Sequence, residues 1–252
     1  MRRKILFVFI GFLITLISHF WAQNVFAESG WGFKRNLNHE TPDIGKYQTL
    51  IEGTSSYYVG NTNNKEIYLT FDAGYDNGEM EKILDILKEK KVRATFFLTG
   101  DFVNRFQDLT IRLVKDGHVV GSHSYYHRPL PKLSMNDLKK DLDLLVERFY
   151  EVTNTFMSSY FRPPAGAFDR QSLLNVQALG YKTIFWSIAF QDWNTNHQRG
   201  IQHSYDSVID NLHNGAIILL HTVSSSNRQA LGMIIDEILR QGYQFKTVQE
   251  LQ

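Results

Sequence analysis

Residues 66–74 read EIYLTFDAG and give the strongest indication of the fold. The run from Ile67 to Phe71 is almost wholly apolar or β-branched, which is typical of a strand buried on both faces of a parallel sheet. It ends on a carboxylate, Asp72, where α/β barrels place catalytic groups. Partial burial there would raise the pKa of the carboxyl group and suit it to act as a base. A turn carboxylate before Gly74 is the plainer alternative.

From this strand to the C-terminus, strand and helix patterns alternate. The sequence predicts further strands at 93–98, 118–121, 160–162, 182–188, 216–220 and 245–248. Helical spacing of apolar residues predicts helices at 80–90, 102–115, 134–149, 169–180, 206–213 and 229–240. Repeated β-α units imply a parallel sheet covered by helices. We therefore expect an α/β fold, an irregular (β/α) barrel of about seven parallel strands with an N-terminal extension.

The regular pattern divides the chain. We expect one domain at 65–252 and an N-terminal extension at 28–64. The extension is weakly periodic and rich in aromatic residues, among them Trp31, Tyr47 and Tyr58. Aromatic side chains at this density are usually buried, so we expect the extension to pack on the domain rather than to serve as a linker.

The first 27 residues have the features of an export signal. Three basic residues at 2–4 precede an apolar run at 5–21, and VFA at 25–27 resembles a small-x-small cleavage site. We predict a signal peptide at 1–27 and export across the cytoplasmic membrane. The alternative is an uncleaved N-terminal membrane anchor, which leaves the protein peripheral to the membrane.

The amino-acid composition excludes several kinds of functional site and partner. The chain of 252 residues contains no cysteine, which excludes disulfides, thiolate nucleophiles and Cys-type zinc sites. Without residues 1–27 its 27 Lys and Arg fall to 24, against 26 Asp and Glu, so the mature chain is slightly acidic. This balance gives no support for a nucleic-acid partner.

His123 and His127 lie four residues apart in the sequence HSYYH. Two imidazoles at this spacing can bind one metal ion where the chain is helical or tightly turned. With a carboxylate base they form the minimum for metal-assisted hydrolysis. Two surface histidines in an aromatic loop are the alternative, because H-x-x-x-H is frequent by chance.

Three further groups of residues follow predicted strand ends. Arg162, before two prolines, can hold a carboxylate through a rigidly placed guanidinium, and the N–H of Ala165 can serve as an oxyanion donor. Trp193 can belong to the core or stack on a sugar ring. His221 can act as a general acid with Asp192 as its partner, or be a core-edge histidine. Their convergence at strand ends is difficult to explain as surface decoration.

Taken in order, these motifs resemble the polysaccharide deacetylases, also called the NodB-homology domain or carbohydrate esterase family 4. The matching segments are TFDAG at 70–74, HSxxH at 123–127, RPPxG at 162–166, DW at 192–193 and LLH at 219–221. The resemblance extends from residue 65 to the C-terminus. It implies the barrel of that family and hydrolysis of carbon–nitrogen (amide) bonds in a polysaccharide.

A narrower resemblance lies upstream. The segments at 31–35 (WGFKR), 38–39 (NH) and 42–43 (PD), with the extended motif at 70–78, are similar to the peptidoglycan N-acetylmuramic acid deacetylases of spore-forming bacteria. That branch makes the muramic δ-lactam of spore cortex. The resemblance implies that the substrate is the glycan strands of peptidoglycan and that the protein acts in the cell wall or spore envelope. We expect the protein to be a monomer.

The resemblance also implies roles for the motif residues. Asp72 would activate water, with Arg162 positioning it. His123 and His127 would bind a divalent metal, zinc or similar, that polarises the acetamide carbonyl. His221 would protonate the departing amine. These roles agree with the chemistry expected from the residues themselves.

Three positions depart from the family pattern. A second Asp usually follows the base and ligates the metal, where this chain has Ala73. We therefore expect weak metal binding, because one of three protein ligands is missing. The fourth motif usually begins with Asp, here Ala189, so tuning of His221 would fall to Asp192. Ala165, often an aromatic, would still offer its N–H to the oxyanion.

Two other functions remain open. One is an N-acetylglucosamine deacetylase acting on chitin-like oligomers or peptidoglycan, which the upstream segment at 31–35 disfavours. The other is a non-catalytic glycan-binding module that has lost its metal. Ala73 favours that function, and the intact pair of Asp72 and His221 opposes it.

Overall fold

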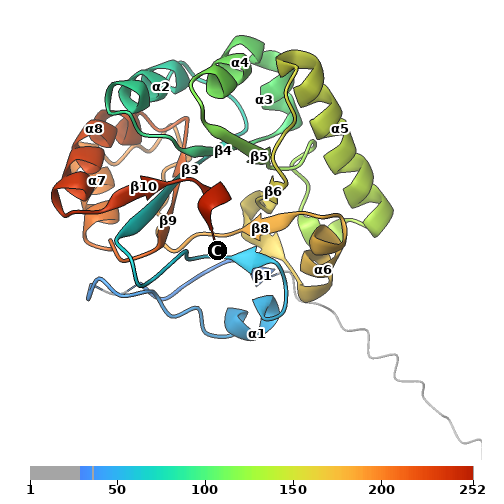
Figure 1. Cartoon of the computed structure of the whole chain (residues 1–252), viewed down its shortest axis with the longest axis horizontal. Helices are drawn as coiled ribbons and strands as arrows, with labels where there is room; N and C mark the ends of the chain where they lie inside the picture. Colours follow the sequence, from blue (N-terminus) through green and yellow to red (C-terminus); the bar gives the residue numbers. More distant parts are fainter. Residues whose placement is uncertain (1–28, 36, 252) are drawn as a thin grey trace, which may run out of the picture.

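The computed structural model describes residues 29–35 and 37–251 (Figure 1). The expected signal segment at 1–27 lies outside this range. Across the described residues, none of the helices has the length and apolar character needed to span a membrane.

The described residues form one large parallel sheet whose strands radiate around a common centre (Figure 1). Its eight strands are β2 (Ser56–Tyr57), β3 (Glu66–Ala73), β4 (Thr95–Leu98), β5 (Val119–Ser122), β6 (Tyr160–Phe161), β8 (Lys182–Ile184), β9 (Ala216–His221) and β10 (Gln244–Lys246). They follow the order β10-β3-β4-β5-β6-β8-β2, and β9 pairs with the other edge of β3. All these pairings are parallel.

The sheet curls until its ends meet. Ile188, beyond β8, forms an isolated parallel bridge with Ile218 of β9, and the N–H of Leu219 donates to the Ile188 carbonyl at 2.9 Å. The expected irregular (β/α) barrel is therefore confirmed, with the short strand β2 added to the predicted set and β10 found where a strand was predicted at 245–248. The predicted strand at 182–188 is interrupted after Ile184. The Arg162 side chain donates hydrogen bonds to the carbonyls of Ile184 and Phe185, which takes the place of regular strand pairing at these two residues.

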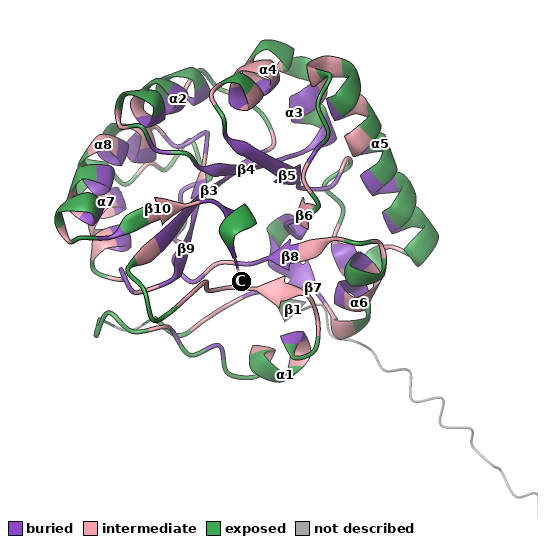
Figure 2. Cartoon of the chain, viewed as in Figure 1, coloured by how far each residue is buried: buried purple, intermediate pink, exposed green. Residues whose placement is uncertain are grey.

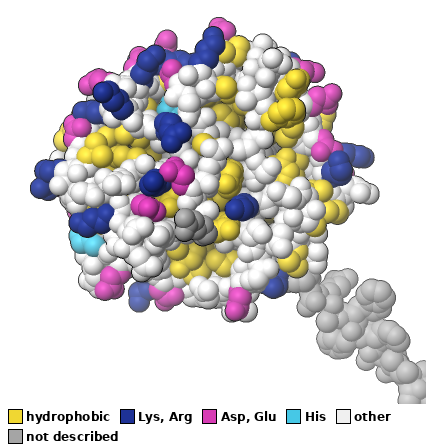
Figure 3. All heavy atoms as spheres, in the orientation of Figure 1, with side chains coloured by type: hydrophobic (Ala, Val, Ile, Leu, Met, Phe, Trp, Pro, Cys, Tyr) yellow, Lys and Arg dark blue, Asp and Glu magenta, His cyan; other side chains and the backbone are white. Residues whose placement is uncertain are grey.

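Helices cover the outside of this sheet (Figures 1 and 2). They are α2 (Met80–Glu89), α3 (Gly100–Arg105), α4 (Gln107–Lys115), α5 (Met135–Thr153), α6 (Arg170–Ala178), α7 (Ile201–Ile209) and α8 (Ser225–Arg240). The helix predicted at 102–115 is two helices, because Phe106 adopts a non-helical ψ of 54° between them. On the face drawn in Figure 3, acidic and basic side chains are interspersed.

Strand β3 shows how the alternation of side chains divides the core. Ile67, Leu69 and Phe71 belong to the cluster that includes the apolar faces of α2 and α8. Tyr68 belongs to a separate cluster with residues of β4, β8 and β9, and the Thr70 hydroxyl donates to the Ile218 carbonyl at 2.6 Å. Asp72 is on the side of Tyr68 and Thr70, because side chains alternate along a strand. This places its carboxylate at the carboxyl end of the barrel interior.

The N-terminal segment packs on the barrel through Trp31. Strand β1 (Ser29–Gly30) pairs with β7 (Ala167–Phe168), and α1 (Tyr47–Ile51) follows. The Trp31 ring stacks on Phe185 with centroids 4.2 Å apart, and its indole N–H donates to the Trp186 carbonyl at 2.9 Å. The Trp31 backbone N–H donates to the Gly166 carbonyl at 2.8 Å. Gly166 has a φ of +62°, and a Cβ there would lie 3.0 Å from the Trp31 side chain.

Replacing Trp31 with alanine should lower the free energy of unfolding by about 3 kcal/mol, because it removes a buried aromatic contact and leaves a cavity. Trp193→Ala is the matched control, since Trp193 is 54% exposed against 8% for Trp31. Chemical denaturation of both variants measures the difference. An equal, small loss in the two would show that Trp31 does not anchor the segment.

Candidate active site

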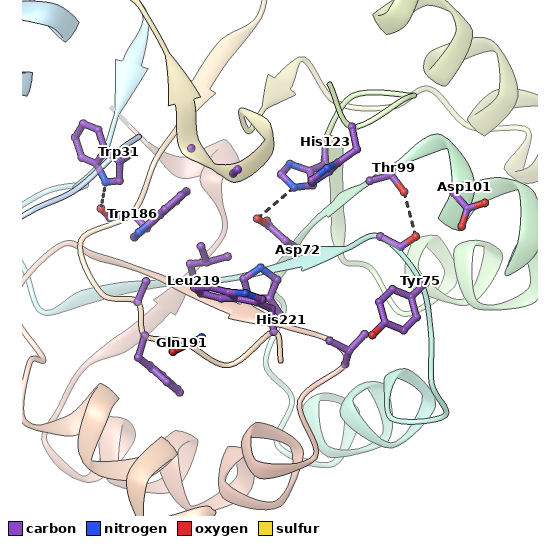
Figure 4. Close-up of a pocket in the computed structure, with 18 of the residues that line it drawn as sticks. Trp31, Asp72, Tyr75, Thr99, Asp101, His123, Trp186, Gln191, Leu219 and His221 are labelled. Atoms are coloured by element: carbon purple, nitrogen blue, oxygen red, sulfur yellow. Dashed lines mark hydrogen bonds and ion pairs between the residues drawn. The ribbon is translucent and has the colours of Figure 1, made fainter. Parts of the chain in front are cut away.

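A cleft of about 1320 Å³ opens at the carboxyl ends of the strands (Figure 4). Six of the predicted site residues line it, namely Asp72, His123, His127, Ala165, Trp193 and His221. Arg162 and Asp192 lie behind the wall, with 0% and 4% of their surfaces exposed. The structure thus gathers all eight predicted residues at or directly behind one cavity. Figure 4 shows Asp72, His123 and His221 turned toward one another.

Asp72 is paired with a buried guanidinium. Arg162 Nη1 donates to Asp72 Oδ1 at 2.9 Å. The guanidinium is fixed by the Ile184 carbonyl at 3.0 Å from Nε and by the Phe97 ring, 4.2 Å from Cζ to centroid. Because the side chain is fully buried and held on several sides, the position of the carboxylate is fixed as well.

The expected upward shift of the Asp72 pKa is wrong. Burial does raise the pKa of this carboxyl group, but Arg162, His123 and His221 outweigh it and hold the pKa below its usual value. A nearby positive charge stabilises the ionised form more than burial destabilises it. Asp72 is therefore ionised at neutral pH.

His123 presents one ring nitrogen to the cleft. Its Nδ1 lies 2.8 Å from the Arg162 carbonyl oxygen, which can only accept, so Nδ1 carries the proton. Nε2 then carries the lone pair and lies 3.6 Å from Asp72 Oδ2. Burial lowers the pKa of His123 to about 4. The imidazole is therefore neutral at pH 7, the form in which histidine binds metals.

His127 reaches the same place through a tight turn, not a helix. Ser124 and His127 both have left-handed backbone conformations, with φ of 68° and 52°. The rings of His123 and His127 lie 4.9 Å apart, inclined by 70°. Burial also lowers the pKa of His127, so both imidazoles are uncharged.

Asp141 holds this turn and was not predicted from the sequence. Its carboxylate is fully buried and accepts the backbone N–H groups of Tyr125 and Tyr126 at 2.7 and 3.2 Å. Arg128 Nη2 lies 3.7 Å away. An acidic residue on the apolar face of α5, beside Leu142, is the signal that sequence reasoning overlooked.

His221 is paired with Asp192. Its Nδ1 donates to Asp192 Oδ1 at 2.7 Å, and its backbone N–H donates to Oδ2 at 2.8 Å. The Asn227 amide donates to the same Oδ2. Burial lowers the pKa of His221, but the charge and hydrogen bond of Asp192 outweigh it, so the pKa lies above its usual value. Asp192 thus favours the protonated imidazolium.

Two further predicted residues shape the cleft. Ala165 has a left-handed backbone with φ of 53° within the turn that follows the two prolines. The Trp193 ring lies 5.6 Å from that of His221. With more than half of its surface exposed, Trp193 is not a core residue, and it forms part of the cleft lining.

The described residues contain no cluster of three or more His, Cys, Asp or Glu able to hold a metal ion. Ala73 is fully buried among the apolar residues of the helix-facing core and offers no ligand. The chemistry of the donors nevertheless fits a divalent ion in part, because two neutral imidazoles lie close together at the cleft. The site thus offers two nitrogen ligands.

Comparisons with known proteins bear on this geometry. Residues 59–184 match the family described as polysaccharide deacetylase. The peptidoglycan-N-acetylmuramic acid deacetylase PdaA of Bacillus subtilis is 45% identical over 222 residues, covering 88% of this chain and 84% of PdaA. The solved structure of PdaA, a family 4 carbohydrate esterase, superposes with a TM-score of 0.86 at 44% identity, covering 89% of this chain and 97% of that one.

Two Bacillus anthracis structures are also similar. A family 4 carbohydrate esterase gives a TM-score of 0.73 at 37% identity, over 88% of this chain and 95% of that one. A pseudoenzyme of the same family gives 0.72 at 30% identity, over 78% and 68%.

Asp141→Ala should lower the free energy of unfolding by about 1–2 kcal/mol, because the backbone N–H groups of Tyr125 and Tyr126 lose their buried acceptor. The amides of Tyr125 and Tyr126 should exchange faster with solvent, measured by hydrogen exchange. Asp143→Ala is the control, since that exposed carboxylate on the same helix pairs with Lys139 at the surface. Unchanged exchange in Asp141→Ala would contradict the anchoring role.

Proposed function

Because the chain belongs to the polysaccharide deacetylase family, we propose that it removes the N-acetyl group of N-acetylmuramic acid in peptidoglycan. One observation carries the proposal. A carboxylate with a lowered pKa and a histidine with a raised pKa face the same cleft, each held by a buried partner of opposite charge. Environments that move two pKa values apart are typical of a base and an acid serving one reaction.

Asp72 is the base in this mechanism. Ionised and fixed by Arg162, it accepts a proton as a water molecule attacks the acetamide carbon. A lowered pKa makes the carboxylate a weaker base, so its contribution depends on being ionised and held in position. We propose that the amide N–H of Ala165, a residue of the cleft lining, stabilises the oxyanion of the tetrahedral intermediate.

His221 is the acid. With Nδ1 donating to Asp192, its Nε2 is free to give a proton to the nitrogen of the breaking carbon–nitrogen bond. The products are acetate and a free amino sugar. His123 and His127 would hold a divalent metal ion, and such an ion supplies polarisation of the acetamide carbonyl. With Ala73 in place of a third ligand, we propose that this ion is bound weakly.

The substrate and location follow from the same proposal. The similarity to PdaA extends through the segment at 31–35, whose Trp31, Phe33 and Arg35 line the cleft. We propose that the protein is an exported, monomeric enzyme that acts on cell-wall glycan strands. Its product would be converted to the muramic δ-lactam of spore cortex.

We also propose the division of the chain into a signal peptide at 1–27, an extension at 28–64 and a domain at 65–252.

Loss of catalysis is a second candidate, favoured by Ala73 and by the similarity to a family pseudoenzyme. A glycan-binding module has no need of a paired base and acid, yet both pairs are formed here. An N-acetylglucosamine deacetylase would share the mechanism and differ in the sugar released. Product analysis separates the three.

Purified protein with added divalent metal should release acetate from peptide-stripped muramic acid glycans, and Asp72→Asn should lower the rate by at least about 100-fold. Mass spectrometry of the products identifies the deacetylated sugar. Deacetylation confined to N-acetylglucosamine would move the assignment to that sugar. No acetate from any glycan would leave the binding module as the function.

Activity should fall as pH rises through the raised pKa of His221, because the neutral imidazole cannot donate a proton. Asp192→Asn removes the charge that raises this pKa, so the alkaline limb of kcat should move to lower pH by about 1 unit. Asp210→Asn, which changes an exposed carboxylate at the C-terminal end of α7, should leave the limb in place. If the alkaline limb of kcat stays at the same pH in Asp192→Asn, then His221 is not a general acid whose pKa is set by Asp192.

A further inference from the structure

The cleft contains a cation that the deacetylation mechanism does not use. Arg35 lines the cavity and is exposed. Its guanidinium donates to the carbonyl oxygen of Ala189, also a cleft residue. Within residues 29–35 and 37–251, no carboxylate lies within 4.0 Å of Arg35 to form an ion pair. Its positive charge therefore faces the cleft uncompensated.

The other charged groups of the cleft wall differ from Arg35 in this respect. Arg105 pairs with Asp101 at 3.0 Å, and both are cleft residues. His123 and His127 are neutral, because burial lowers their pKa values. His221 is held by Asp192 at 2.7 Å. Arg35 is thus the cleft group best placed to receive a negative charge from a ligand.

The backbone that precedes Arg35 is held by hydrogen bonds. The neighbouring Lys34 forms a bridge with Asp43, whose carbonyl accepts the Lys34 N–H at 2.8 Å. Asp43 Oδ1 accepts the N–H of Gly45 at 2.7 Å. A second guanidinium, Arg199, is close enough to act with Arg35 on His203, and burial and both charges lower the pKa of His203 despite the opposing carboxylate of Asp206. Positive charge therefore predominates around His203.

The two amino sugars of peptidoglycan differ by one charged group. N-acetylmuramic acid carries a 3-O-lactyl ether, whose carboxylate is free when no peptide is attached, and N-acetylglucosamine has a hydroxyl there. We propose that Arg35 binds the lactyl carboxylate and so selects N-acetylmuramic acid, an inference that rests on the proposed deacetylase function. A guanidinium is suited to this task because its planar fork can bind a carboxylate through two hydrogen bonds.

Ala189 is part of the same arrangement. It supplies a carbonyl that orients Arg35 and no carboxylate that would neutralise it. An aspartate at position 189 would compete with the substrate carboxylate for the guanidinium. Ala189→Asp is therefore a second variant that should weaken the same interaction without removing Arg35.

The test compares three substrates: glycan with free lactyl carboxylates, the same glycan with the lactyl groups converted to amides, and a chito-oligosaccharide. Arg35→Gln should lower kcat/KM about 10- to 100-fold on the free carboxylate and leave the amidated glycan unchanged. The kcat/KM of Arg35→Lys on the free carboxylate should lie between those of the wild type and Arg35→Gln, because lysine keeps the charge and loses the planar fork. Ala189→Asp should also reduce the preference for the free carboxylate over the amide. Lys34→Gln removes the same charge outside the cleft lining and should leave that preference unchanged.

The outcomes are separable. Equal losses on the free and amidated glycans, or no loss on either, would overturn the role of Arg35 while the deacetylase function stands. A wild-type protein that deacetylates no muramic glycan would instead refute the proposed function. Binding of the stripped glycan to the Asp72→Asn variant, with and without Arg35→Gln, gives a readout independent of turnover. Failure of Arg35→Gln to weaken that binding would also count against the proposal.

Discussion

The buried ion pair between Arg162 and Asp72 is the interaction on which the rest of the site depends. The Arg162 side chain fixes the base, takes the carbonyls of Ile184 and Phe185 where strand β8 ends, and lies against Phe97. Its own carbonyl sets the tautomer of His123. A buried charge without its partner is destabilising, so removing the charge of either residue alone should lower the stability of the barrel.

A second pair, His221 and Asp192, raises the pKa of its functional group, whereas the first pair lowers the pKa of Asp72. Arg162 holds a carboxyl group in its ionised form, and Asp192 holds an imidazole in its protonated form. The two strands that carry them, β3 and β9, are adjacent, with Asp72 paired in register with His221. Direct strand pairing thus sets the separation of the two groups, and the buried partners set their protonation. Fold and chemistry are coupled through the same backbone hydrogen bonds.

The sequence predicted the parallel barrel and all eight residues gathered at the cleft, because apolar strands and the polar residues after them are local patterns. It did not predict the direction of the Asp72 pKa. That direction depends on Arg162, which is 90 residues away in the chain and in contact in the fold. Asp141 is an acidic residue on an apolar helix face, a signal that the sequence contains, but its partners are backbone amides that the sequence alone does not identify. The break at Phe106 was also missed, since the helical pattern continues across it.

The sequence alone determined which chemical groups are available: a carboxylate and a histidine at strand ends, two imidazoles in one loop, and no ligand at Ala73. Only the tertiary structure decided their states. It buried Arg162 beside Asp72, turned the Nε2 of His123 to the cleft, and brought Arg35 from the N-terminal segment to the cleft wall. The reason is physical. Side-chain identity and short-range spacing are written along the chain, whereas charge state and orientation depend on distances and burial between segments that meet only when the sheet closes.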